Sequence, residues 1–115
     1  MYGELLPLIE ARGYPHIVRI WNIVEDINRV EGDLERYRQF CLGRHEAYVS
    51  RCPDLGDQFP AATAVGSRAG GLTVYAIAAK SAGLLVENPN QVSAYRYPRL
   101  YGPRSPSFSR ALVKE

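Results

Sequence analysis

The segment PHIVRIWNI narrows the possible folds of this chain more than any other stretch. Its apolar residues occupy both alternating sides of an extended backbone: Val18 and Ile20 on one side, and Ile17, Trp21 and Ile23 on the other. A strand that is apolar on both sides lies in the interior of a sheet and is covered on both faces. The segment therefore predicts a central strand with packing layers above and below it.

Four further segments have the periodicity of regular elements. ELLPLIEAR, residues 4–12, predicts a short helix that Gly13 ends. Asp33 predicts the N-cap of a long helix that runs to about Ser50, with apolar residues close to a 3.6-residue period. AATAVGS and LTVYAIAAK predict two strands, and the RAGG between them favours a hairpin. SFSRALV alternates and predicts an edge strand.

These elements follow one another in the order α-β-α-β-β. The order predicts an α+β fold, a sandwich in which two helices cover one face of a mixed sheet. The length suits one hydrophobic core, so residues 1–115 are expected to form a single domain. Two helices need more strands than the sequence supplies. We therefore expect either self-association or a further segment to complete the sheet.

Charge and hydropathy exclude several classes of protein. Hydrophobic residues make up 46% and charged residues 23% of the chain, as in ordinary globular domains. The formal net charge is only +2, and no block of basic residues occurs, which argues against a nucleic-acid partner. No apolar stretch is long enough to span a membrane, and the N-terminus lacks the basic start of a signal peptide. We expect a cytoplasmic protein.

Cysteines and histidines give no sign of a metal site. Cys41 and Cys52 lack the C-x-x-C spacing of redox and zinc motifs, and His16 and His45 do not cluster with them. We expect two reduced thiols, no metal and no cofactor. His16 is interpreted as structural, and His45 as a surface residue of the long helix.

The segment ENPNQVSAYRYPRLYGPRSPSFSRA, residues 87–111, is rich in proline, tyrosine and arginine. Tyr95 and Tyr97 are two residues apart, so an extended backbone would point both to the same side. Tyr101 adds a third phenol, and the prolines of GPRSP restrict the backbone around Arg104. Phenols beside arginines suit a cyclic substrate that carries carboxylates. The alternative is a loop that only packs over the sheet.

Arg44 lies near the middle of the apolar stripe of the long helix, seven residues after Tyr37 and four before Tyr48. Burial of an unpaired guanidinium is costly, so we expect an anion beside it. Two interpretations stay open at this point. Arg44 either binds the carboxylate of a ligand, or it pairs with an internal carboxylate or extends past the edge of the stripe.

Other polar side chains suggest no catalytic pair. The acidic residues have no spacing typical of a general acid and base. Three serines of the C-terminal segment have no nearby His or Asp partner, so a serine nucleophile has little support. These are Ser105, Ser107 and Ser109. Catalytic residues therefore stay unassigned.

Four stretches of the chain carry a family resemblance. They are PHIVRIWNIVEDIN, ERYRQFCLGRHEAY, FPAATAVGSRAGGLTVYAIAAK and the segment of residues 87–111. Together they resemble the central region of the chorismatases, over about residues 15–111. The family is similar in fold to the RidA/YjgF proteins, which implies a RidA/YjgF-like (chorismate mutase-like) sandwich. RidA/YjgF proteins are trimers with ligand sites between subunits, which implies a homo-oligomer here, with a trimer as the stoichiometry to test.

The resemblance also implies a function. Chorismatases cleave chorismate to pyruvate and a cyclic acid, so the implied ligand is chorismate or a similar cyclic dicarboxylate. Arg44 matches an arginine expected to hold a substrate carboxylate, and Tyr95 and Tyr101 match tyrosines that line the pocket. Tyr97 and Arg104 belong to the same motif. The acid of the family is a glutamate far downstream that no residue here matches, so hydrolytic release of pyruvate would need an acid supplied from elsewhere.

Two alternatives remain beside this interpretation. RidA-type enamine/imine deaminases resemble one another in a Pro-Ala-Arg-Ser/Thr stretch whose arginine binds the substrate carboxylate. The matching stretch here is PAAT, with Ala62 in place of that arginine, which argues against this chemistry. The other alternative is a non-catalytic oligomeric module that binds aromatic carboxylates and needs no acid.

Overall fold

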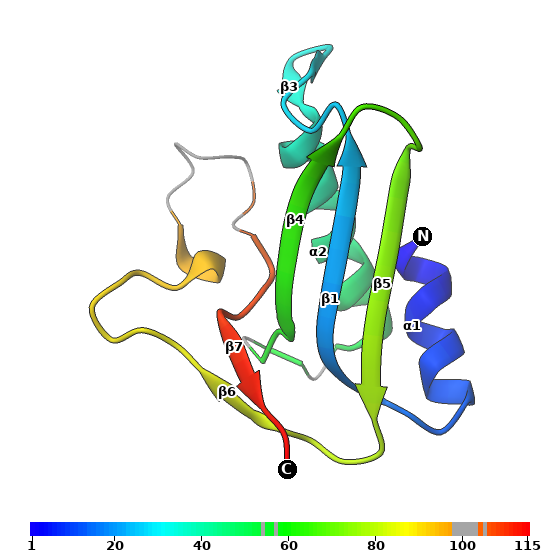
Figure 1. Ribbon diagram of the computed structural model, residues 1–115, viewed down its shortest axis with the longest axis vertical. Coiled ribbons are helices and arrows are strands. Elements are labelled where there is room, and N and C mark those ends of the chain that lie inside the picture. The colour runs from blue at the N-terminus through cyan, green and yellow to red at the C-terminus, as the bar shows by residue number, and fades with distance from the viewer. Residues whose placement is uncertain (54, 57, 98–103, 105) are drawn as a thin grey trace.

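The structure, a computed structural model, describes residues 1–53, 55–56, 58–97, 104 and 106–115. A three-stranded sheet lies against two helices, α1 (Tyr2–Ala11) and α2 (Arg36–Arg51), which both cover the same face (Figure 1). The predicted α+β class, with two helices on one face of a mixed sheet, is confirmed. The remaining elements are β1 (His16–Glu25), β2 (Val30–Glu31), β3 (Leu34–Glu35), β4 (Ala61–Ser67), β5 (Leu72–Ala79), β6 (Leu84–Val86), the 3₁₀ helix η1 (Ala94–Arg96) and β7 (Ala111–Val113).

The strand order of the main sheet is β4-β1-β5, with β1 parallel to β4 and antiparallel to β5. β1 is therefore the central strand, as predicted, but the predicted hairpin between β4 and β5 is wrong because β1 lies between them. Their connection, residues 68–71, crosses the end of β1 and is held there by the backbone. The Glu25 amide donates to the Gly71 carbonyl at 2.8 Å, and the Asp26 amide donates to the Ser67 carbonyl at 2.9 Å.

The two faces of the sheet differ. On the helix side, Ile20 is 0% exposed and Val24 is 8% exposed. On the other side no described residue covers the sheet, and Tyr75 is 59% exposed. Coverage of β1 on both faces, expected from its sequence, is thus wrong for the described part of the chain. We call this side the open face; its apolar residues are Trp21, Ile23, Val65, Tyr75 and Ile77.

Aromatic rings join the two helices above the sheet. The Tyr2 ring of α1 packs edge-on against two rings of α2, with centroids 6.0 Å from Phe40 and 5.8 Å from Tyr48. Tyr48 in turn packs against Phe59, which follows the helix in sequence. The sequence placed α1 at residues 4–12; the helix spans Tyr2–Ala11, and Gly13 follows its end as predicted.

Asn22 is a polar residue at the centre of this core and is 0% exposed. The Tyr2 hydroxyl donates a hydrogen bond to its Oδ1, and its Nδ2 donates to the Thr63 carbonyl at 3.0 Å. Both ends of the amide therefore have partners. Asn22 links α1, β1 and β4 without leaving a buried polar atom unpaired.

The start of α2 differs from the prediction. The helix begins at Arg36, while Asp33 lies in the turn between β2 and β3 and does not cap it. Carbonyl groups of the preceding loop replace the cap. The Arg36 amide donates to the Arg29 carbonyl at 2.8 Å, and the Tyr37 amide donates to the Ile27 carbonyl at 2.9 Å. These bonds pair amides that have no partner within the helix.

The C-terminal strand is only partly the predicted edge strand. β7 pairs with β6 in a separate two-stranded ribbon, whereas Ser109 forms an isolated parallel bridge with Ala61 of β4. The Ser109 amide donates to the Pro60 carbonyl at 3.0 Å. The ribbon brings the two ends of residues 87–110 together, so this segment leaves the sandwich and returns to it (Figure 1).

The described residues offer neither a membrane-spanning helix nor a metal cluster. None of their helices is both long and apolar enough to cross a lipid bilayer. The same residues contain no group of three or more His, Cys, Asp or Glu side chains placed to hold a metal ion.

Candidate ligand-binding site

The candidate ligand-binding site is built around Arg44, a buried cation on α2. Its side chain is 2% exposed, as its place in the apolar stripe of α2 predicted, so it does not extend into solvent. Aromatic rings lie beside the guanidinium: its Cζ is 4.8 Å from the ring centroid of Phe40 and 5.8 Å from that of Phe108. Cation–π attraction offsets part of the cost of burying the charge.

The guanidinium has an edge without a partner. Nε and Nη2 are buried, and neither forms a hydrogen bond with any described residue. No carboxylate among the described residues pairs with Arg44 either. These two nitrogens share one edge of the guanidinium, which is the geometry that binds both oxygens of a carboxylate. The internal ion pair considered from the sequence is absent from the described part of the chain.

Phenols and a thiol surround this charge. Burial raises the pKa of Tyr37 to about 12 and also raises the pKa values of Tyr2 and Cys41, while the positive charge of Arg44 acts in the opposite direction on all three. All three groups are thus held in their neutral forms near neutral pH. Tyr97, from the C-terminal segment, has a smaller electrostatic effect that also raises the pKa of Tyr37.

The expectation that Tyr95 and Tyr97 point to the same side is wrong. η1 spans Ala94–Arg96, so the backbone here turns and is not extended. Tyr95 packs against Phe59 of the core, with ring centroids 5.9 Å apart, and its predicted place in the ligand pocket stays a prediction. The Tyr97 hydroxyl instead accepts a hydrogen bond from Arg110 Nη2 at 3.3 Å.

The two remaining residues predicted for the site, Tyr101 and Arg104, come from the second half of residues 87–111. Arg104 is exposed, and its charge lowers the pKa of His45, the residue that follows Arg44. Arg104 therefore lies near α2, but no contact between it and the Arg44 guanidinium is observed. Tyr101 lies outside the described residues, so its predicted place in the site stays a prediction.

His45 and Ser107 form a pair that the sequence analysis missed. His45 Nδ1 lies 3.1 Å from Ser107 Oγ, so the statement that Ser107 has no His partner is wrong. His45 is also half-buried, not a surface residue as expected. Ser107 is 1% exposed, and burial lowers the pKa of His45. A hydroxyl that is closed off from solvent suits a structural link better than a nucleophile.

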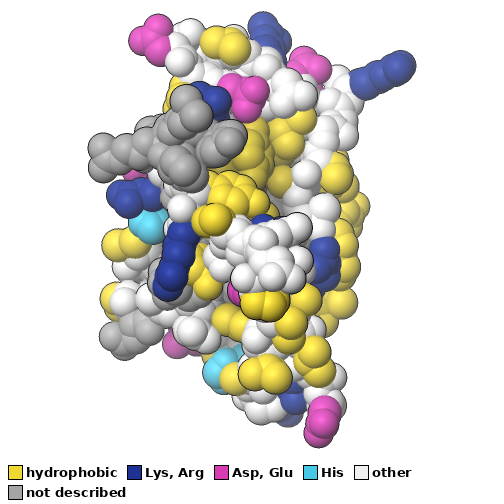
Figure 2. Space-filling model, turned by 90° about the vertical axis from the view of Figure 1, so that its left-hand side faces the viewer, with side chains coloured by type: hydrophobic (Ala, Val, Ile, Leu, Met, Phe, Trp, Pro, Cys, Tyr) yellow, Lys and Arg dark blue, Asp and Glu magenta, His cyan; other side chains and the backbone are white. Residues whose placement is uncertain are grey.

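The C-terminal segment is fixed at its ends. Arg110 Nη2 donates to the Val92 carbonyl at 2.9 Å, and Arg110 Nε lies 3.6 Å from Glu87 Oε2. Figure 2 views the molecule from the side of this segment, where basic side chains lie among apolar ones. The described ends of the segment are thus anchored to each other, and Phe108 lies beside the Arg44 guanidinium. The alternative that the segment only packs over the sheet stays a prediction, because residues 98–103 and 105 lie outside the described residues. Phe40 could have been found from its place one helical turn before Arg44; nothing in the sequence indicated Phe108.

Comparison with known proteins identifies the family. Residues 1–78 match the family model described as "Chorismatase FkbO/Hyg5-like, N-terminal". The chain belongs to the chorismatase family. The chorismatase fold is also found by structure: a crystal structure of a chorismatase superposes with a TM-score of 0.92 at 40% identity, over 99% of this chain and 35% of that chain. The predicted family resemblance is confirmed, while the further likeness to RidA/YjgF proteins stays a prediction.

The similar proteins of known sequence are much longer. The chain is 49% identical over 112 residues to a 3-hydroxybenzoate synthase of Streptomyces hygroscopicus, and 47% identical over 113 residues to a chorismatase of Streptomyces rapamycinicus. Each match covers 96% of this chain but only 33% and 34% of the relative. The chain therefore spans about a third of the length of these chorismatase relatives.

Proposed function

We propose that this chorismatase-family chain binds chorismate or a similar cyclic dicarboxylate, with Arg44 as the carboxylate-binding residue. The observation that carries the proposal is the buried edge formed by Nε and Nη2, which has no partner among the described residues. A ligand carboxylate would supply both missing acceptors in two parallel charge-assisted hydrogen bonds. Family membership makes chorismate the first ligand to test.

Turnover is the finer part of the proposal. Cleavage of an enol ether needs an acid that protonates the enolpyruvyl group, and the resemblance assigns that role to a glutamate beyond the matched region. We propose that pyruvate is released hydrolytically only when such an acid is supplied from elsewhere. Without it, this chain acts as a binding module for cyclic carboxylates.

Calorimetric titration with chorismate tests the binding step. The wild-type chain should bind saturably, and Arg44→Lys should weaken binding about tenfold or more, because an ammonium cannot form the forked contact. Arg51→Lys makes the same exchange at an exposed position of α2 and should leave the affinity unchanged. Equal affinities in the wild type and Arg44→Lys would contradict the proposed role of Arg44.

An assay for pyruvate separates the enzyme from the binding module. Chorismate is incubated with the purified chain, and pyruvate is followed over time. Saturable binding without pyruvate supports the module, whereas sustained release from this chain alone would show that the chain includes an unrecognised acid.

We also propose that the chain forms a homo-oligomer, with a trimer as the stoichiometry to test, in which the open face is covered. Tyr75 and Ile77 are 59% and 54% exposed on this face, and apolar patches of this kind commonly mark interfaces. A native mass measurement should find an oligomer that Tyr75→Lys dissociates. A monomeric wild type would contradict this proposal. The two cysteines are free thiols, which supports a reducing location such as the cytoplasm.

A further inference from the structure

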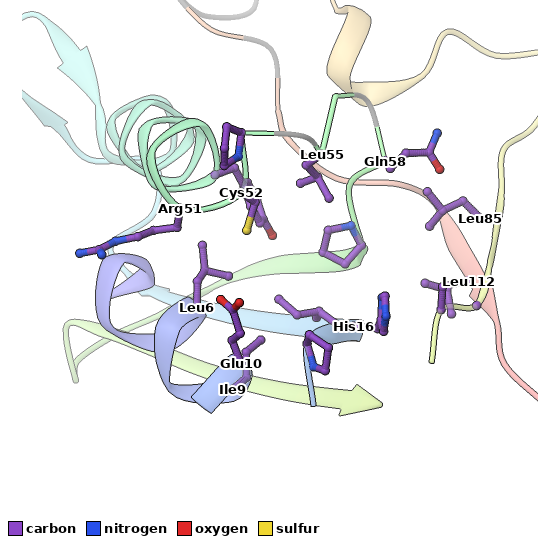
Figure 3. Close-up of a pocket in the computed structure, with 17 residues that line it drawn as sticks. Leu6, Ile9, Glu10, His16, Arg51, Cys52, Leu55, Gln58, Leu85 and Leu112 are labelled. Atoms are coloured by element: carbon purple, nitrogen blue, oxygen red, sulfur yellow. The ribbon is translucent and has the colours of Figure 1, made fainter. Parts of the chain in front are cut away.

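A cavity of about 460 Å³ lies at the end of the sandwich away from the Arg44 guanidinium, and Arg44 does not line it. We call it the end cavity. Its walls come from α1, the start of β1, the end of α2 with the loop that follows, and the β6–β7 ribbon (Figure 3). Its volume falls in the range of small-molecule sites, roughly 300–1,000 Å³. Nothing in the chorismatase function proposed above uses it.

Most of the lining is apolar. Leu6 and Ile9 project from α1, Leu55 from the loop after α2, and Leu85 and Leu112 from the ribbon (Figure 3). Small-molecule sites are typically apolar with a few polar groups that set the orientation of the ligand. The body of a ligand here would be aliphatic or similarly apolar, since these walls offer it no hydrogen bonds.

Charge at the end cavity is one-sided. The lining includes Glu10 and Arg51, but the Glu10 carboxylate projects toward the middle of the lining residues, whereas the Arg51 guanidinium points away (Figure 3). The Glu10 carboxylate forms no hydrogen bond or ion pair with any described residue, whereas the Glu10 backbone carbonyl accepts a hydrogen bond from the Gly13 amide at 3.0 Å. Cys52 lines the same cavity as Glu10, and burial, followed by the charge of Glu10, raises the pKa of its thiol. The free charge beside the cavity is therefore negative.

We propose that the end cavity binds a small amphiphilic amine, with its apolar body among the leucines and its ammonium group on Glu10. A solvent-accessible carboxylate that lines a largely apolar cavity favours a cationic head group over a neutral or anionic one. The proposal is independent of the Arg44 site, because the two sets of residues do not overlap.

Three probes with the same alkyl chain test this inference: hexylamine, 1-hexanol and hexanoate. Calorimetry should find hexylamine bound about fivefold or more tightly than the other two, as expected for a partly exposed ion pair. Cys52 reports on the site directly. Saturating hexylamine should slow its alkylation by iodoacetamide, while alkylation of the buried Cys41 after the same treatment should not change.

Two matched variants decide the role of the charge. Glu10→Gln should reduce the affinity for hexylamine to that for 1-hexanol, and Arg51→Gln, which removes a charge that points away, should leave the preference intact. Leu85→Trp should fill the cavity and weaken all three probes. Equal binding of the three probes, a preference that survives Glu10→Gln, or a lack of both binding and Cys52 protection would overturn the proposal.

Discussion

Asn22 and Arg44 are two of the buried polar residues of this small domain, and their surroundings differ sharply. Asn22 lies between α1 and the sheet and has a hydrogen-bond partner at each end of its amide. Arg44 lies on α2 between two aromatic rings, and two of its nitrogens have no partner among the described residues. Burial alone therefore does not distinguish a polar side chain with a structural role from one that binds a ligand. The pairing of its donors and acceptors does.

The largest expected change in stability follows from the loss of Asn22, the buried polar side chain whose hydrogen bonds are satisfied. Asn22→Leu removes the acceptor of the Tyr2 hydroxyl and the side-chain donor to the Thr63 carbonyl, and it leaves the buried Tyr2 hydroxyl without this partner. We expect the free energy of unfolding to fall by about 2–4 kcal/mol. Urea denaturation measures this value. Tyr2→Phe leaves only the Asn22 acceptor unpaired and should cost less than Asn22→Leu.

Replacement of Arg44 should instead increase the stability of the fold. Arg44→Met removes a buried charge that has no carboxylate partner and two unpaired nitrogens among the described residues, so the free energy of unfolding should rise by about 1–2 kcal/mol, while binding of chorismate is lost. Urea denaturation without ligand and calorimetry with ligand check the two halves. A fall in stability as large as that of Asn22→Leu would erase the distinction between the two residues.

A smaller effect is expected at the ion pair that closes the C-terminal segment. Glu87 and Arg110 have side-chain exposures of 22% and 30%, so the pair is intermediate between buried and solvated. Glu87→Gln should lower the free energy of unfolding by about 0.5–1 kcal/mol. Limited proteolysis should also cut residues 87–110 faster than in the wild type. Unchanged cleavage would show that the ribbon alone holds the segment.

The smallest effect concerns His45. Burial, and then the charge of Arg104, lower its pKa from the ordinary 6.5, against a weaker opposing effect of Glu46. The unfolded chain thus binds the proton more readily, so this contribution to stability is complete above pH 6.5 and is lost as the pH falls through the folded pKa. The urea midpoint should therefore drop between pH 7.5 and pH 5.5 by more in the wild type than in His45→Gln. These two pH values are chosen to lie about one unit on each side of the ordinary pKa.

Local patterns predicted the elements but not the way they pair. The alternating apolar residues of β1 indicated a central strand correctly. Gly70 and Gly71 indicated a turn correctly too, since both have positive φ. Neither pattern contains information about which strand lies beside which, because the pairing of β1 with β4 and β5 joins residues far apart in sequence. The hairpin prediction failed for that reason.

The candidate site was predictable to a similar extent. The helical spacing of Arg44 from Tyr37 and Tyr48 placed it in the apolar stripe, because α2 imposes a regular geometry, but it did not decide between burial and extension past the edge of the stripe. The pair of His45 and Ser107 joins residues 62 positions apart, and no periodicity relates them. The contact of Arg44 with Phe108 is of the same kind. Such contacts depend on the path of the C-terminal segment, which tertiary packing sets.

The insertion of β1 between β4 and β5 has a consequence for the order of assembly. Residues 68–71 must span two interstrand spacings, about 9.6 Å, so they serve as a spacer whose width admits one more strand. No two adjacent strands of the main sheet are connected by a tight turn, so strand pairing in this sheet cannot start from a local hairpin. β1 can pair only after β4 and β5, which follow it in the chain, have come beside it. Closure of the long loop between β1 and β4, residues 26–60, is therefore expected to limit the rate at which the domain folds.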